Sequence, residues 1–215
     1  MGFNLSDNVV ARGLARFLDF IILNILFLIC SLPIITIGAS VTALYTVMLK
    51  IVRDEEGYIV KGFLQAFKDN FKTSTIAWLI ILPINLVIYF NIYLSGHLPM
   101  FSNAFVVFFF ILGLFSVCGC VYVFPLIARY ENSLKTTFKN AFLLAIARLP
   151  YTILLVIIHL APVIITALDL QTLILGMFVW FLIGFSLVAW LSSIVLRRVF
   201  EIFEDKEDKE DKEEL

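Results

Sequence analysis

The sequence predicts an all-α fold, namely a polytopic helical membrane protein with six spans and cytoplasmic amphipathic helices. Of its 215 residues, 61% are hydrophobic and only 15% are charged, and the mean hydropathy is +1.00. A water-soluble domain of this length is usually nearer half apolar and about a quarter charged. A small domain cannot hide such an apolar excess from water, so the composition requires a bilayer as solvent.

Four apolar segments of spanning length follow the first 50 residues. A helical span needs roughly 20 apolar residues, and segments of about this length occur at residues 74–93, 105–127, 151–168 and 172–195. The links 94–103 and 169–171 are short, which predicts that these spans pair as antiparallel hairpins.

The opening apolar run predicts two further spans. Residues 20–49 carry no charge, and 30 residues of helix would measure about 45 Å, too long for one span. Extended to Arg12 and Arg53, the run suits two spans with a tight turn at "SLPIITIGAS". Pro33 ends the first of them, because proline lacks an N–H and disfavours helical geometry in the residue before it.

Small residues after this turn predict close packing of the second span. Gly38 and Thr42, like Ala39 and Ala43, are four positions apart. They therefore share a smooth helix face that lets a neighbouring backbone approach closely.

Charge supports six spans over five. With six, all 16 Lys and Arg residues lie on one side, and the links 31–40, 94–103 and 169–171 contain none. The positive-inside rule makes that side, with both termini, cytoplasmic. The five-span alternative places Arg12 and Arg16 outside.

Residues 1–203 form one transmembrane domain, and residues 204–215 form a charged tail that is either solvated or a continuation of the last helix.

Two cytoplasmic segments carry apolar residues at helical spacing beside lysines. Residues 58–72, "YIVKGFLQAFKDNFK", predict an amphipathic helix in the membrane interface, and residues 130–142 repeat the pattern more weakly. Basic links between spans commonly look like this. The functional alternative is a docking surface formed by Arg53, Lys61, Phe63, Phe67, Lys68, Phe71, Lys135, Phe138 and Lys139.

Four residues with amide or imidazole side chains lie within the expected spans, namely His159, Asn24, Asn85 and Asn91. Burying a polar side chain in lipid is unfavourable, so each requires a partner or a function. Hydrogen bonds between helices are one explanation. For His159 a proton relay or a substrate contact is the other, since imidazole titrates near physiological pH.

The combination of "SLPIITIGAS", "ALYTVMLKIVRDEEGYIVKGFLQAFKDNFK" and Trp78 resembles the YesL-like family of bacterial membrane proteins, a domain of unknown function (DUF624). The resemblance implies a bacterial cell membrane protein associated with carbohydrate utilisation and sugar ATP-binding-cassette (ABC) importers. It supplies no catalytic or ligand-binding residues.

Known catalytic signatures are missing from the sequence, which has no His-Glu-x-x-His, Gly-x-Ser-x-Gly or Walker lysine loop. We therefore expect a non-catalytic accessory protein with no cofactor and no metal. The alternative is a small-solute transporter or channel. The expected partners are membrane lipid and sugar ABC importer subunits, the oligomeric state is left open, and a net charge of −1 indicates no nucleic-acid partner.

Overall fold

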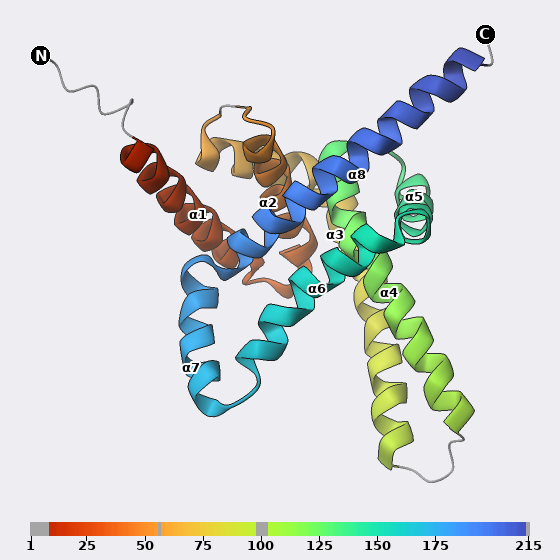
Figure 1. Ribbon diagram of the computed structural model, residues 1–215. Coiled ribbons are helices and arrows are strands. Elements are labelled where there is room, and N and C mark those ends of the chain that lie inside the picture. The colour runs from red at the N-terminus through yellow and green to blue at the C-terminus, as the bar shows by residue number, and fades with distance from the viewer. Residues whose placement is uncertain (1–8, 56, 98–102, 214–215) are drawn as a thin grey trace, which may run out of the picture.

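The chain folds into helices joined by short links, as the sequence predicts (Figure 1). The computed structural model describes residues 9–55, 57–97 and 103–213, with side chains described in 13–55, 57–95 and 105–203. In chain order the elements are α1 (Val9–Ser31), η2 (Ile34–Thr36), α2 (Ile37–Val52), α3 (Ile59–His97), α4 (Asn103–Arg129), α5 (Leu134–Ala147), α6 (Leu149–Thr166), α7 (Leu170–Val179), η3 (Trp180–Gly184) and α8 (Phe185–Glu213).

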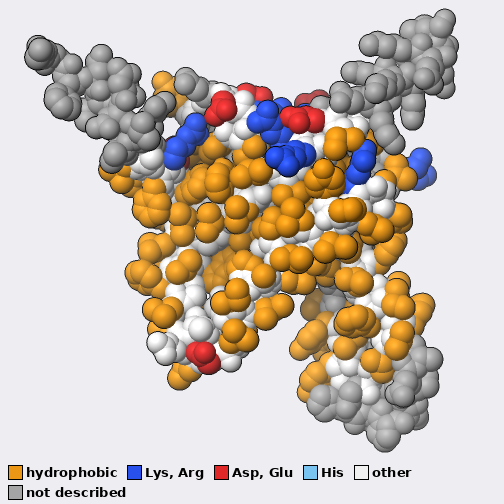
Figure 2. All heavy atoms as spheres, in the orientation of Figure 1, with side chains coloured by type: hydrophobic (Ala, Val, Ile, Leu, Met, Phe, Trp, Pro, Cys, Tyr) orange, Lys and Arg blue, Asp and Glu red, His pale blue; other side chains and the backbone are white. Residues whose placement is uncertain are grey.

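Six segments of the described chain are long and apolar enough to span a membrane. They are Gly13–Ser31, Ile34–Val52, Ile59–Ser95, Phe105–Arg129, Leu149–Thr166 and Leu170–Phe203. The six-span expectation is therefore confirmed over the five-span alternative. Figure 2 shows basic side chains gathered at one end and apolar side chains covering the flanks, as expected for a multi-pass membrane protein. We call the end with the basic side chains the charged end.

The central helix of the bundle is α2. In the apolar stretch of Ile34–Val52, 61% of the residues are buried inside the protein, compared with at most 22% in the apolar stretches of the other five spans. Helices α3, α4 and α8 all pack against α2. The small residues of its first turns make this central position possible, because they let neighbouring backbones come close.

Helix α3 joins two segments that the sequence analysis treated as separate. Residues 58–72 were expected to form an interfacial helix and residues 74–93 a span, but Ile59–His97 is one helix. Between Phe63 and Leu82 the sequence has no glycine or proline that would end it. Figure 1 shows its first turns running across the charged end before the helix turns to lie beside α4. Part of the link at residues 94–103 lies outside the described residues.

Two other expectations concern the later helices. The weaker amphipathic segment does form a separate helix, α5, which begins where the Ser133 side chain accepts a hydrogen bond from the Thr136 amide. The last span contains a π-helical turn, η3, and α8 then continues as far as Glu213. The charged tail thus extends the last helix, as one of the two alternatives for it requires. Its side chains from residue 204 onward lie outside the description.

Candidate functional site

The turn between the first two spans is closed by a residue of the third. The indole nitrogen of Trp78 on α3 donates a hydrogen bond of 2.8 Å to the carbonyl oxygen of Ile34. The Thr36 hydroxyl lies 2.6 Å from the carbonyl oxygen of Cys30 and 2.8 Å from that of Pro33, and its single proton is shared between them. Carbonyl groups in the last turn of a helix have no partner within the helix, and the Thr36 hydroxyl supplies one for such a carbonyl of α1. The turn motif and Trp78, which carried the family resemblance, form one structural unit.

The predicted close approach beside this turn is also present. A Cβ atom on Gly38 would overlap the backbone carbonyl oxygen of Ser74 and lie 2.7 Å from Cβ of Trp78. One turn further along α2, the Ser74 hydroxyl donates to the Thr42 hydroxyl at 2.8 Å. Gly38 and Thr42 therefore bring α2 and α3 into contact.

Asn24 joins α1 to the π-helical turn of the last span. Its Nδ2 donates to the carbonyl oxygens of Trp180, at 3.0 Å, and Phe181, at 2.7 Å, and its Oδ1 accepts from the amide of Ser186 at 3.1 Å. The Ser186 hydroxyl donates to the carbonyl oxygen of Phe20 at 2.9 Å. The fully buried amide of Asn24 thus inserts into the backbone hydrogen-bond ladder at the point where the helix departs from α geometry.

His159 on α6 is hydrogen-bonded at both ring nitrogens. Nδ1 lies 2.8 Å from the carbonyl oxygen of Leu155, and Nε2 lies 2.9 Å from the hydroxyl of the buried Tyr45 on α2. Because a carbonyl can only accept, Nδ1 carries the proton and Nε2 accepts from the Tyr45 hydroxyl. This arrangement satisfies a neutral imidazole and links α6 to the central helix.

The two asparagines of α3 differ in their partners. Asn85 accepts from the Ser116 hydroxyl of α4 at 3.2 Å, so it makes the expected hydrogen bond between helices. Asn91 donates to the carbonyl oxygen of Val87 at 2.8 Å, within its own helix. For Asn91 the expectation of an interhelical bond is not met by any hydrogen bond of the described residues.

The lysines of the predicted docking surface are exposed at the charged end. Lys61 and Lys68 lie on α3, and Lys135 and Lys139 lie on α5. Arg53 is different, because its Nε lies 3.3 Å from the Leu49 carbonyl oxygen and 3.2 Å from a carboxylate oxygen of Glu55. Arg53 therefore caps the end of α2 and is held by local partners.

The phenylalanines of the same surface mostly face the bundle, which corrects the sequence prediction. Phe63 is fully buried, Phe67 and Phe138 are half-buried against the core, and 40% of Phe71 is exposed. Helical spacing identified an apolar face but could not show that the bundle covers it. These side chains fix the first turns of α3 and α5 to the bundle. They leave Tyr58, just before α3, and Val60 and Leu64, in its first turns, as exposed apolar residues.

Comparison with known proteins identifies the segment that contains the turn and its tryptophan. Residues 20–92 match the family described as "Protein of unknown function, DUF624". This segment is similar to the DUF624 family. The resemblance stated from the sequence is confirmed, and the DUF624 segment holds Asn24, Gly38 and Trp78 together with α2 and most of α3.

One curated relative of the chain is the uncharacterized protein YteU of Bacillus subtilis (strain 168). The two are 26% identical over 143 residues, which cover 65% of this chain and 64% of YteU. The alignment therefore spans slightly less than two thirds of either protein. No solved structure is significantly similar to this chain.

Sequence reasoning missed the partners of the deep polar groups. Tyr45, Ser74 and Ser186 all donate hydrogen bonds between helices, yet none was a candidate. The available signal was the presence of hydroxyl groups in apolar spans, since a buried hydroxyl needs a partner.

Proposed function

We propose that this DUF624 protein is a non-catalytic accessory protein of the bacterial cell membrane whose charged end docks onto a transport complex. The observation that carries the proposal is a set of four exposed lysines, Lys61, Lys68, Lys135 and Lys139, on two helices fixed to the bundle by phenylalanines. Cations held on fixed helices form a defined electrostatic surface, which favours a partner with a complementary acidic surface.

The charge distribution supports a cytoplasmic position for this end and for both termini. The described turns at the other end carry no Lys or Arg, and the positive-inside rule then orients the protein. Impermeant thiol labelling tests this orientation in a variant whose three cysteines are replaced by alanine. Cysteine at Ile35, which is 56% exposed in the turn, should react in intact cells, whereas cysteine at Lys139 should react only after permeabilisation. The opposite pattern would reverse the orientation.

The partner we propose is a sugar ABC importer, in keeping with the family resemblance. The test is co-purification of the tagged full chain with the permease subunits of a sugar importer expressed in the same cells, in mild detergent. We expect the wild type to retain the permease. A variant with Glu at all four lysines should retain at least about tenfold less, because juxtaposed like charges cost several kcal/mol.

A matched variant with Arg at the same four positions keeps the charge and should retain the permease as the wild type does. If no permease subunit is retained above background by the wild type, or if the Glu variant retains as much, the docking proposal is wrong.

The alternative of a small-solute transporter needs a polar cavity that reaches His159 and the asparagines of α3. Hydrogen bonds from Tyr45 to His159 and from Ser116 to Asn85 support the accessory proposal instead, because they satisfy these groups within the protein. Solute flux into proteoliposomes that is abolished by His159→Ala would favour the transporter.

A further inference from the structure

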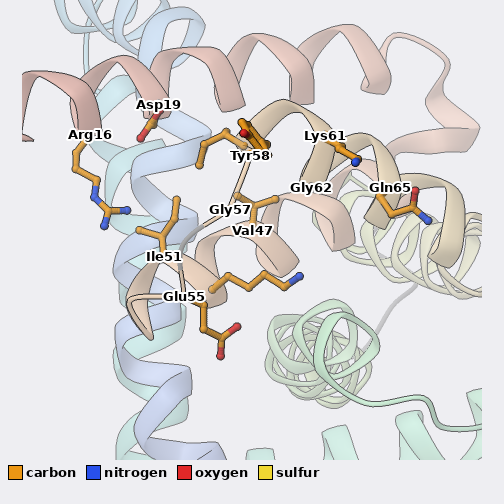
Figure 3. Close-up of a pocket in the computed structure, with 12 residues that line it drawn as sticks. Arg16, Asp19, Val47, Ile51, Glu55, Gly57, Tyr58, Lys61, Gly62 and Gln65 are labelled. Atoms are coloured by element: carbon orange, nitrogen blue, oxygen red, sulfur yellow. The ribbon is translucent and has the colours of Figure 1, made fainter.

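A hollow at the charged end lies between α1, the end of α2 and the start of α3. Its volume is about 780 Å³, and its wall includes Arg16, Lys50, Tyr58 and Lys61. Figure 3 shows Arg16 and Asp19 on α1, facing Ile51 at the end of α2 and Tyr58 just before α3. A hollow of this size is within the range that small molecules occupy in proteins.

Three helices each contribute one cation to this hollow. Arg16 comes from α1, Lys50 from α2 and Lys61 from α3, and all three side chains are exposed. Among the described residues, two carboxylates also line it, but Glu55 is already paired with Arg53 at 3.2 Å. Among the described lining residues, the remaining carboxylate, Asp19, is opposed by three cations, so these residues favour an anion.

Part of the wall of the hollow is apolar. Val47 and Ile51, both buried, lie beside the cations. On α1 the neighbours of Arg16 include Leu14 and Phe17, which are 60% and 51% exposed. The hollow therefore lies where the charged end meets the apolar flank, which is the depth of lipid headgroups in a bilayer.

A second, smaller groove adjoins the first along α3. It shares Tyr58, Lys61 and Gln65 with the hollow and adds the exposed apolar residues Val60 and Leu64. A ligand with one anionic group and attached hydrocarbon chains would match both surfaces, since its charge meets the lysines while its chains meet the apolar residues.

We propose that this hollow binds the phosphate group of a membrane phospholipid. The lysines supply point charges and the guanidinium of Arg16 supplies paired N–H donors, a combination that suits phosphate oxygens. The position at the edge of the apolar flank selects a phosphate that carries acyl chains over a free phosphate ion. This proposal does not depend on docking to a transporter.

Native mass spectrometry of the full chain in detergent, with phosphatidylglycerol added, tests the site. The test variant carries Arg16→Gln, Lys50→Gln and Lys61→Gln together. The matched control carries Lys72→Gln, Lys135→Gln and Lys139→Gln, which remove the same charge from exposed residues that do not line this hollow. Each cation near an anionic lipid surface contributes about 1 kcal/mol, so half-maximal retention by the test variant should require at least about tenfold more lipid.

The control variant should bind phosphatidylglycerol as the wild type does, and millimolar inorganic phosphate should not displace the lipid. Equal binding by the test variant and the wild type, with both eluting as folded protein on gel filtration, would overturn the site. Displacement by inorganic phosphate alone would overturn the lipid as its ligand. A Lys50→Arg, Lys61→Arg variant, which keeps both charges, should bind as the wild type and exclude loss of fold as the cause.

Discussion

The indole nitrogen of Trp78 lies 2.8 Å from the carbonyl oxygen of Ile34, so a side chain of the third span closes the turn between the first two. Replacing Trp78 by Phe keeps a ring but removes the donor. We expect the free energy of unfolding in detergent micelles to fall by about 1 kcal/mol. Trp190→Phe is the control, because Trp190 packs against Phe20 with no hydrogen bond among the described residues. Equal losses in the two variants would contradict a role for the hydrogen bond.

Gly38 should tolerate no side chain. A methyl group there would overlap the Ser74 carbonyl oxygen, so Gly38→Ala should lower the free energy of unfolding by about 1–3 kcal/mol. A Cβ atom on Gly13 of α1 would meet nothing within 4 Å, and Gly13→Ala should therefore be neutral or slightly stabilising. Thermal unfolding of both variants in the same detergent checks this contrast.

Asn24 should contribute far more to stability than Asn91. Asn24→Ala removes three hydrogen bonds to the backbone of the last span, and we expect a loss of about 1–3 kcal/mol. Asn91 bonds only its own helix among the described residues, and Asn91→Ala should cost less than about 0.5 kcal/mol. Similar unfolding temperatures for the two variants would contradict the proposed clamp on the π-helical turn.

Asp54 occupies a position that suits glycine. Its φ is 55°, and the amides of Glu55 and Asp54 bond the carbonyl oxygens of Lys50 and Ile51, which is a Schellman ending of α2. Asp54→Gly removes the Cβ strain of the left-handed conformation and should stabilise the protein by about 1 kcal/mol. Asp54→Ala keeps the Cβ atom and should give no gain, as unfolding in micelles will show.

Asp169 lies at the end of the protein opposite the lysines, and its carboxylate should make the stability of the protein depend on pH. It accepts a hydrogen bond of 2.8 Å from the Thr172 amide, and this bond lowers the pKa of Asp169 below its usual 3.8. Because the pKa is lower in the folded protein, the stabilisation is fully present above pH 3.8. It is lost as the pH falls through the lowered pKa of folded Asp169. Asp169→Ala should therefore unfold at a lower temperature than the wild type at pH 7, with the difference shrinking at acidic pH. A difference that does not change with pH would contradict this assignment.

The spans and the first turn could be predicted because their causes are local. Pro33 and the uncharged run from residue 20 to residue 49 required a turn, and the small residues from Gly38 to Ala43 indicated close packing. The continuity of α3 was missed because the change in hydropathy at Lys72 was taken as a boundary between two helices. The sequence has no helix-breaking residue there, so the helix continues.

Other features depend on residues far apart in the sequence. Asn24 was recognised as a polar group needing a partner, but Trp180 and Phe181 lie more than 150 positions away. Phe63 was assigned to a docking surface because spacing shows which residues share a face, whereas only the packed bundle shows which face is covered.

The π-helical turn Trp180–Gly184 sets the rotational register of the last span. One additional residue in a helix rotates every later side chain by about 100° about the helix axis. No residue of α7 is buried, whereas Ala189, Ser193 and Leu196 beyond the turn are. Deleting one residue from the turn would rotate Ala189, Ser193 and Leu196 away from the bundle and toward the hydrocarbon. The number of residues in Trp180–Gly184 is therefore constrained even at positions where the side chain is free to vary.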